Sequence, residues 1–235
     1  MTRLPEADVY ITTGDLLPNF PLLLVDNGRA GTSWIPTGTA TWLGRGKEPR
    51  INGYVVDRKI DHERETALQT EWVEKKREEM RECFSSPNAP VVCVRGNHDF
   101  VDLAGFVGGD VFEIGTDGEW WTEIEGVRFG GFRGIPYIAG EWSDELQEAE
   151  MAARIDRLPA DLDVLVTHCP LRGVLDKYGH SYGSVPLASY VTKKAYSERP
   201  LKLHAFGHIH SSAGLIKLGS TQFSNAAETI QVIDI

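Results

Sequence analysis

Short apolar runs along the chain stop repeatedly at glycine, histidine or aspartate. Four of these runs predict strands, at residues 9–13, 90–95, 163–167 and 203–206. Short apolar runs bounded by turn residues are typical of buried strands. Loops that leave the carboxyl ends of strands converge at one edge of an open sheet, where ligands bind. We therefore expect the polar residues that follow these four runs to lie close together.

Two segments have a helical pattern. Residues 62–83 have a helix-favouring composition, with apolar residues on one stripe and charged residues on the other faces. A second helix is predicted from Ser143, whose hydroxyl can cap it, to Arg157. Residues 112–133 and 213–233 have β-like patterns. The alternation of strands and helices predicts an α/β or layered α+β fold.

Residues 19–57 do not fit this alternation, because they combine many glycines with Trp34, Trp42 and several basic residues. A loop of this length in a compact domain usually contains unrecognised hairpins or has a function of its own. We expect a single domain over residues 1–235, with residues 19–57 as a long insertion. It either forms hairpins or packs against the body, or it acts as a substrate-selecting flap.

Composition restricts the partners of the chain. The formal net charge is -10, which argues against broad electrostatic capture of nucleic acid or of an anionic membrane, so nucleic acid stays open only as a substrate. No apolar run reaches the roughly 18 residues of a membrane helix, and no signal-peptide pattern opens the chain. The three cysteines form no C-x-x-C pair. We expect a protein of the reducing cytoplasm without a membrane segment.

The residues that follow the predicted strands carry oxygen and imidazole ligands. Aspartate, asparagine and histidine supply oxygen and nitrogen ligands suited to Mn, Fe, Zn or Ni, and indicate such a site rather than one built from cysteine thiolates. A single histidine at a strand end is more often structural, but an ordered set of such residues is hard to obtain by chance. Two divalent ions can clamp the attacking and leaving oxygens of a phosphoryl transfer, so the pattern favours metal-assisted hydrolysis.

These residues also resemble a known family. Four segments look like four of the five motifs of the calcineurin-like metallophosphoesterases, in family order: Gly14-Asp15, Gly96-Asn97-His98-Asp99, Thr167-His168 and Gly207-His208-Ile209-His210. Further segments, at residues 167–176 and 223–234, are similar to one branch of small single-domain enzymes. The resemblance implies a two-sheet β-sandwich flanked by helices.

The resemblance also implies a site with two divalent ions. Asp15 would bridge both ions, and one of them would also be bound by Asn97, His168 and His208. His210 would bind the other ion. The reaction implied is hydrolysis of a phosphomonoester or phosphodiester by attack of metal-bound hydroxide.

Two more roles come from the same resemblance. His98 would lie beside the leaving oxygen as general acid or transition-state stabiliser, and Asp99 would orient its ring.

The sequence itself names no substrate. His180, in a glycine-rich loop, and Arg133, after a glycine-rich strand, are the candidates for substrate contacts. Cys169 is expected to be buried rather than reactive, because it points away from His168.

One family motif is absent. The family begins with Asp-x-His at the end of a first strand, but only 13 residues precede Gly14 and none is histidine. We expect that the natural protein begins earlier, with a strand missing here. The alternative is a chain that holds one ion well and the other poorly. The missing motif also keeps open a second function, a non-catalytic scaffold or binding protein with a decayed metal site.

Overall fold

The computed structural model describes most of the chain. The described residues are 5–17, 22–26, 32–36, 50–51, 54–59, 62–85, 89–107, 109–116, 118–138, 140 and 142–235, with the backbone alone at 22–59, 83–85 and 106–107. Four strands lie close to their predicted positions: β1 (Tyr10–Thr12), β6 (Val91–Cys93), β12 (Val164–Thr167) and β15 (Leu203–Phe206).

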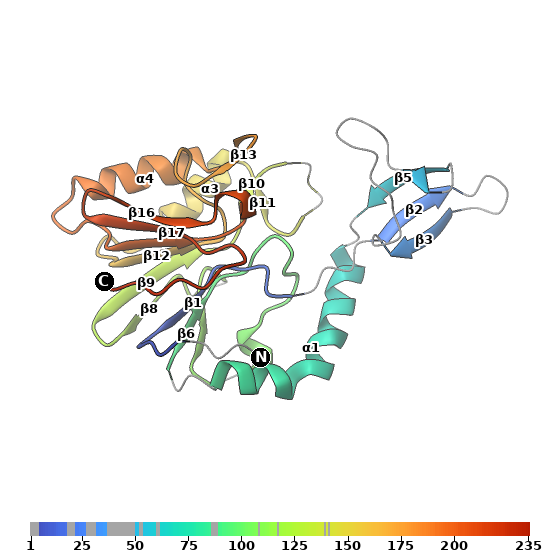
Figure 1. Ribbon diagram of the computed structural model, residues 1–235, viewed down its shortest axis with the longest axis horizontal. Helices are drawn as coiled ribbons and strands as arrows, with labels where there is room; N and C mark the ends of the chain where they lie inside the picture. The colour runs from blue at the N-terminus through green and yellow to red at the C-terminus, as the bar shows by residue number, and fades with distance from the viewer. Residues whose placement is uncertain are drawn as a thin grey trace.

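The strands build two main sheets that pack face to face (Figure 1). The smaller sheet is parallel and has the order β1-β6-β7, with β7 at Val111–Glu113. The larger sheet has the order β16-β17-β15-β12-β9-β8. Its remaining strands are β8 (Trp121–Ile124), β9 (Val127–Phe132), β16 (Gly214–Leu218) and β17 (Thr221–Asn225).

An apolar core joins the two sheets. Val92 of the smaller sheet and Phe129, Val164 and Leu203 of the larger one belong to a single buried cluster, and Ile11 packs against it. Burying these faces against each other removes apolar surface from water, which stabilises the pair of sheets. The predicted two-sheet sandwich is confirmed.

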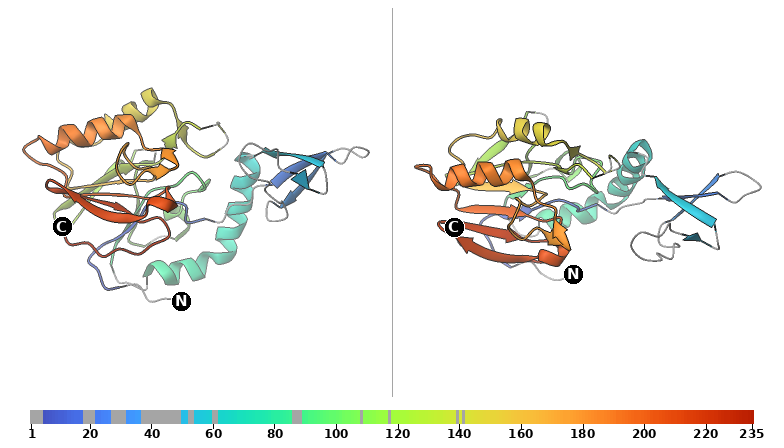
Figure 2. Two further views of the ribbon diagram at one scale, coloured as in Figure 1. Left: turned by 45° about the horizontal axis from the view of Figure 1, so that its top comes forward. Right: turned by 90° about the horizontal axis from the view of Figure 1, so that it is seen from above.

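Helices cover the outer faces of the sandwich (Figure 2). Helices α3 (Glu148–Ile155) and α4 (Val185–Ala195) place Met151 and Leu187 in a buried cluster with Phe206 of the larger sheet. On the other side, α1 (His62–Ser85) packs through Val73 against Leu103, which precedes the short helix α2 (Ala104–Val107). In the described part of the chain, no helix has the length and apolar character needed to cross a membrane.

The described residues of the segment predicted as an insertion form antiparallel strands. Its sheet has the order β3-β2-β5-β4 and extends beyond the start of α1, away from the sandwich (Figure 1). The hairpin alternative is therefore confirmed for the described residues, whereas the flap stays a prediction. The strands are β2 (Leu22–Asp26), β3 (Thr32–Pro36), β4 (Arg50–Ile51) and β5 (Tyr54–Lys59).

The second predicted helix begins later than expected. Residue Ser143 does not cap it, because Asp144 has a positive φ of 53° and the next two residues form strand β11 (Glu145–Leu146), paired with β10 (Ile135–Pro136). Helix α3 starts after Gln147, whose backbone N–H donates to the Glu150 carboxylate at 2.8 Å in a capping box. The prediction was wrong because the Asp144 side chain forms ion pairs with Arg133 and Arg154, and Asp144 does not belong to the first turn of the helix.

The core also contains a neutral histidine. His204 of β15 is fully buried, and its Nε2 lies 2.8 Å from Thr167 Oγ1. The Thr167 hydroxyl donates to the Cys169 carbonyl, so Nε2 carries the donating hydrogen. The other ring nitrogen, Nδ1, has no hydrogen-bond partner in the described structure. Burial lowers the pKa of His204 to about 3.

We expect His204 to make the fold sensitive to acid. Its folded pKa lies below the ordinary value of 6.5, so its contribution to stability is complete above pH 6.5 and is lost as pH falls from 6.5 towards 3. Between these pH values, protonation of His204 in the unfolded chain should lower the free energy of unfolding by up to about 1.4 kcal/mol for each unit by which the pH falls. Urea unfolding between pH 4.5 and 7.5 should show a shallower acid loss for His204→Phe than for wild type. Equal slopes would contradict this, and His180→Asn, at an exposed histidine, is the control.

Candidate metal centre

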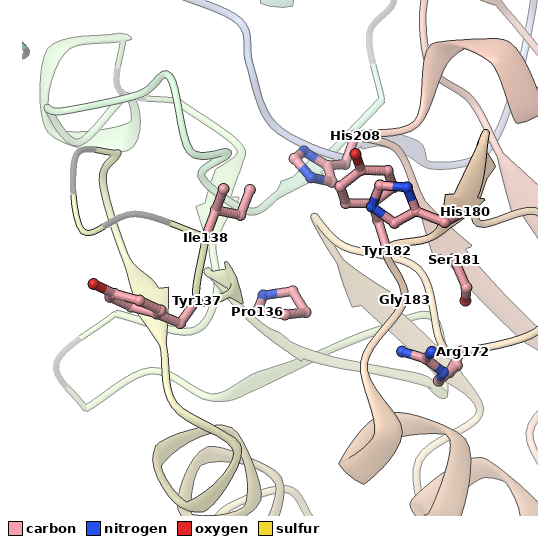
Figure 3. Close-up of a pocket in the computed structure, with 9 residues that line it drawn as sticks. All are labelled: Pro136, Tyr137, Ile138, Arg172, His180, Ser181, Tyr182, Gly183 and His208. Atoms are coloured by element: carbon pink, nitrogen blue, oxygen red, sulfur yellow. The ribbon is translucent and has the colours of Figure 1, made fainter. Parts of the chain in front are cut away.

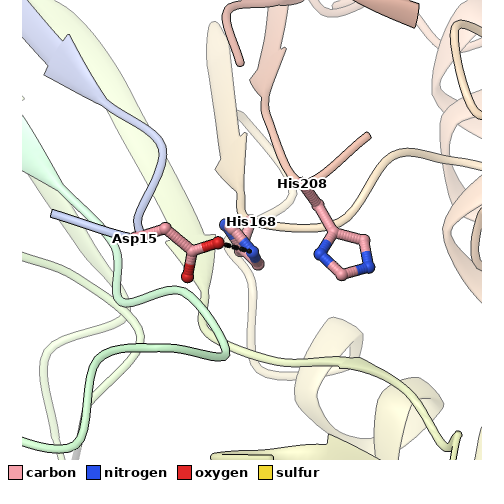
Figure 4. Close-up of side chains that lie close together, drawn as sticks. All are labelled: Asp15, His168 and His208. Atoms are coloured by element: carbon pink, nitrogen blue, oxygen red, sulfur yellow. Dashed lines mark ion pairs between the residues drawn. The ribbon is translucent and has the colours of Figure 1, made fainter. Parts of the chain in front are cut away.

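Four loops bring polar side chains to one edge of the sandwich. Asp15 follows β1 and Asn97 follows β6 in the smaller sheet, while His168 follows β12 and His208 follows β15 in the larger one. Ligand atoms of Asp15, His168 and His208 lie within 4.8 Å of one another (Figure 4). The carboxyl ends of the parallel strands therefore meet where the sequence predicted the chemistry.

His168 is the centre of this cluster. It is 1% exposed, and its Nδ1 lies 2.6 Å from the Thr13 carbonyl oxygen, to which it donates. Its Nε2 faces two oxygens, Asn97 Oδ1 at 2.9 Å and Asp15 Oδ2 at 3.3 Å. Three ligand-type atoms therefore converge on one point, where either a proton on Nε2 or a cation can hold them together. The donor set fits a divalent metal of the kind that imidazole and carboxylate share.

The charges in the cluster are coupled. Burial would raise the pKa of Asp15, but the charge of His168 and the contact with it lower that pKa below its usual range. Burial would lower the pKa of His168, but Asp15 raises it overall. For His208, burial and the charge of His168 lower the pKa to about 3, so its ring is neutral. Neutral imidazole and ionised carboxylate are the forms that bind metal.

The backbone around the cluster is strained. Asp15 has a φ of 56° and His208 a φ of 66°, both in the left-handed region that residues with a side chain rarely adopt. Gly14, with φ at 94°, allows the turn that presents Asp15. Strain of this kind persists only where the surrounding structure imposes it, and it gathers at functional sites.

Asp99 fixes the backbone that carries Asp15. It is completely buried, and its carboxylate accepts three backbone hydrogen bonds: from Asp15 N at 2.7 Å, Gly96 N at 2.8 Å and Leu17 N at 2.9 Å. Burial, together with the nearby charge of Asp15, raises the pKa of Asp99. These bonds join the loops after β1 and β6. Orientation of the His98 ring by Asp99 stays a prediction.

His98 lies at the rim of the cluster. Its backbone N–H donates to Asp15 Oδ1 at 2.9 Å, and its ring centroid lies 4.5 Å from the Trp142 ring. Gln69 of α1 holds the same loop, because its amide donates to the His98 carbonyl at 2.6 Å and accepts from Phe100 N at 2.7 Å. Sequence reasoning missed Gln69 and Trp142. The only sequence signal for Gln69 is its position beside the apolar stripe of the helix.

A cavity of about 320 Å³ adjoins the cluster and shares His208 with it (Figure 3). His180, predicted as a substrate contact, lines this cavity. Arg133 does not line it, because its guanidinium forms an ion pair with Asp144 at 3.0 Å. His180 therefore lies where a ligand of this cavity could contact it and Arg133 does not, and both substrate roles stay predictions.

His210 also lies apart from the cluster of described ligand residues. Its side chain is 58% exposed, and its Nδ1 lies 3.1 Å from the exposed Glu228 carboxylate. The second-ion role of His210 stays a prediction. Cys169, by contrast, is fully buried as expected, and burial raises its pKa to about 12.

Comparison with known proteins agrees with this geometry. A UPF0046 protein of Caenorhabditis elegans is 34% identical over 113 residues, which are 45% of this chain and 34% of the relative. Human metallophosphoesterase domain-containing protein 1 is 31% identical over 108 residues, 44% of this chain and 32% of the relative. The chain thus matches about a third of the length of these curated relatives.

The fold and the family agree as well. A solved crystal structure superimposes with a TM-score of 0.51 at 12% identity, over 69% of this chain and 66% of the other, which shows a shared fold. The family model described as calcineurin-like phosphoesterase matches residues 2–212, most of the chain and every motif that forms the cluster. The chain therefore belongs to the calcineurin-like phosphoesterase family.

Proposed function

We propose that the chain is a hydrolase that cleaves a phosphomonoester or phosphodiester with the help of a divalent metal, Mn²⁺ being the first candidate. The observation that supports this most is the convergence of Asp15, Asn97, His168 and His208 from four strand ends. These four residues would hold the ion. When bound, it would supply positive charge at the phosphate group and make water a stronger acid.

The residues of the chain have distinct tasks in this proposal. His168 has its ring fixed by the Thr13 carbonyl, so Nε2 stays directed at the cluster. Asp99 holds the Asp15 backbone in its strained turn. His98, anchored through its backbone to Asp15 and packed on Trp142, presents its ring at the rim, where it would give a proton to the leaving oxygen.

We expect His98→Ala to lose turnover while it retains the metal. The bond from residue 98 to Asp15 is made by the backbone, so the substitution leaves the ligand positions intact. The rate of hydrolysis should fall by about 10²- to 10⁴-fold. The fall should be larger for phenyl phosphate than for 4-nitrophenyl phosphate, because the poorer leaving group needs the proton more. Steady-state hydrolysis with Mn²⁺ measures the loss of turnover, and calorimetric titration of Mn²⁺ shows whether the variant retains the metal.

The control is Lys217→Ala, an exposed side chain on edge strand β16. It should hydrolyse both esters as wild type does. The proposal fails if the Mn²⁺-loaded wild-type protein cleaves neither 4-nitrophenyl phosphate nor bis(4-nitrophenyl) phosphate.

A second candidate is a non-catalytic binding protein on the same fold. The observation that favours it is the exposed pair of His210 and Glu228, which leaves His210 outside the ligand cluster. The same His98→Ala experiment separates the two candidates, because a scaffold would lose nothing that depends on a leaving group.

A further inference from the structure

The cavity beside the metal centre has two different walls. Pro136, Tyr137 and Ile138, after strand β9, form one side, and Arg172 with residues 180–183 forms the other (Figure 3). His208 lies at one end. A volume of about 320 Å³ is at the lower end for sites that bind small organic molecules, so the cavity has room for a ring with a substituent.

One wall carries stacked aromatic rings. The rings of His180 and Tyr182 have centroids 4.1 Å apart and are tilted by 32°, and Tyr178 lies 6.5 Å from Tyr182. Across the cavity, Tyr137 is 52% and Ile138 is 50% exposed. Aromatic faces and exposed apolar groups on two sides of an opening suit a flat ring better than a flexible polar chain.

Arg172 supplies a positive charge in the same cavity. It is exposed, and no carboxylate of the described residues lies within ion-pair distance of its guanidinium, in contrast to Arg133 and Arg154, which both pair with Asp144. Figure 3 shows Arg172 apart from His208 in the same cavity. A guanidinium binds carboxylate or phosphate oxygens through two parallel hydrogen bonds.

Hydrogen bonds to a buried carboxylate hold the aromatic wall in place. Asp176 is 1% exposed and accepts hydrogen bonds from Gly173 N at 3.0 Å, Gly183 N at 3.2 Å and the Ser181 hydroxyl. These bonds close the loop that carries the hairpin of β13 (Lys177–Tyr178) and β14 (His180–Ser181). The site is therefore ordered before a ligand arrives, which lowers the entropy cost of binding.

A second set of bonds ties this hairpin to the metal centre. The hydroxyls of Ser211 and Ser212, in the short helix η2 (His210–Ser212), both donate to the Lys177 carbonyl at 2.8 Å. Helix η2 begins two residues after His208, so the aromatic wall and the metal ligand form one connected unit. A substrate can contact both at once.

We propose that this cavity binds the organic part of the phosphate ester and selects a flat ring that carries a second anionic group. The phosphate lies at the His208 end, the ring packs on His180 and Tyr182, and Arg172 binds the second anion. This assignment rests on the proposed function only in placing the phosphate at the metal cluster.

The test is a binding measurement with ligands that cannot be hydrolysed. Calorimetric titration in Mn²⁺ compares methylphosphonate, phenylphosphonate and 4-carboxyphenylphosphonate. Wild type should bind the carboxylated compound about tenfold or more tightly than phenylphosphonate, as a charge-assisted contact implies. Arg172→Ala should remove this preference and leave phenylphosphonate binding unchanged. Tyr182→Ala should weaken both aryl compounds and leave methylphosphonate unchanged.

The control is Arg199→Ala, an exposed arginine that pairs with Asp161 and Asp163 and does not line the cavity. It should bind all three phosphonates as wild type does. The proposal is overturned if wild type shows no preference for the carboxylate, if it binds no phosphonate, or if Arg172→Ala weakens both aryl compounds equally.

Hydrolysis distinguishes this proposal from the proposed function. A protein that shows the Arg172-dependent preference but does not cleave 4-carboxyphenyl phosphate has the subsite without the activity. A protein that cleaves aryl phosphates without that preference has the activity without the subsite.

Discussion

Replacing Asp15 by Asn is expected to weaken Mn²⁺ binding by about 100-fold or more and to reduce hydrolysis at least as much. Asp15 Oδ2 lies 3.3 Å from His168 Nε2, and its carboxylate is the one formal negative charge among the described cluster residues Asp15, His168 and His208. Asn keeps the shape and can still accept the His98 N–H through one oxygen. The loss should therefore reflect charge rather than a collapsed loop. Calorimetric titration of Mn²⁺ and steady-state hydrolysis measure the two effects.

The matched control is Asp110→Asn, which neutralises an exposed carboxylate away from the cluster. It should bind Mn²⁺ and turn over as wild type does. If Asp15→Asn retained wild-type Mn²⁺ affinity, the cluster would not be the metal site. A Mn²⁺ affinity reduced equally in both variants would show that overall charge, and not Asp15, attracts the ion.

The position of the cluster could be predicted because its information is local. Each of β1, β6, β12 and β15 is a short apolar run followed directly by polar residues, and both features can be seen in a few residues of sequence. Parallel pairing within each sheet then aligns their carboxyl ends, as registers such as Tyr10 with Val91 show. Because ligands bind at the carboxyl edge of such sheets, this alignment predicts where the site lies.

What the sequence did not reveal depends on contacts between distant residues. Gln69 binds the loop 29 residues further along the chain, and nothing near Gln69 indicates that partner. A helix was predicted to begin at Ser143, but Arg133 and Arg154 form ion pairs with the next residue, Asp144, and hold it outside a helix. Such tertiary contacts override local propensity, because helix propensity is a weak preference and the ion pairs of a half-buried carboxylate stabilise another conformation more.

The cavity shows the same division. His180 could be suspected from its glycine-rich loop, and it does line the cavity. Arg172 could not be separated from Arg133 by sequence, because both follow apolar segments and either could reach a substrate. Only the structure shows that Arg133 pairs with Asp144, while Arg172 faces the cavity without a carboxylate partner among the described residues.

Gly96 determines how closely the loops of the smaller sheet approach each other. A Cβ at this position would lie within 3.0 Å of Asp15 Oδ1 and Asp15 N. Both atoms are already engaged, because Oδ1 accepts from His98 N and the Asp15 N–H donates to Asp99. Since Asp15 N is a backbone atom, no rotation of a side chain can relieve that contact.

Gly96→Ala should therefore separate the two loops and displace the Asp15 carboxylate. We expect a loss of about 3 kcal/mol in the free energy of unfolding, the upper part of the range for an added methyl group in a packed site, together with loss of Mn²⁺ binding. Gly105→Ala is the matched control, because a Cβ there meets nothing within 4 Å and alanine favours the helix. Urea unfolding and Mn²⁺ titration compare the two variants with wild type. If Gly96→Ala kept wild-type stability and Mn²⁺ affinity, the close approach of these loops would not be what positions Asp15, and the strained turn alone would have to hold it.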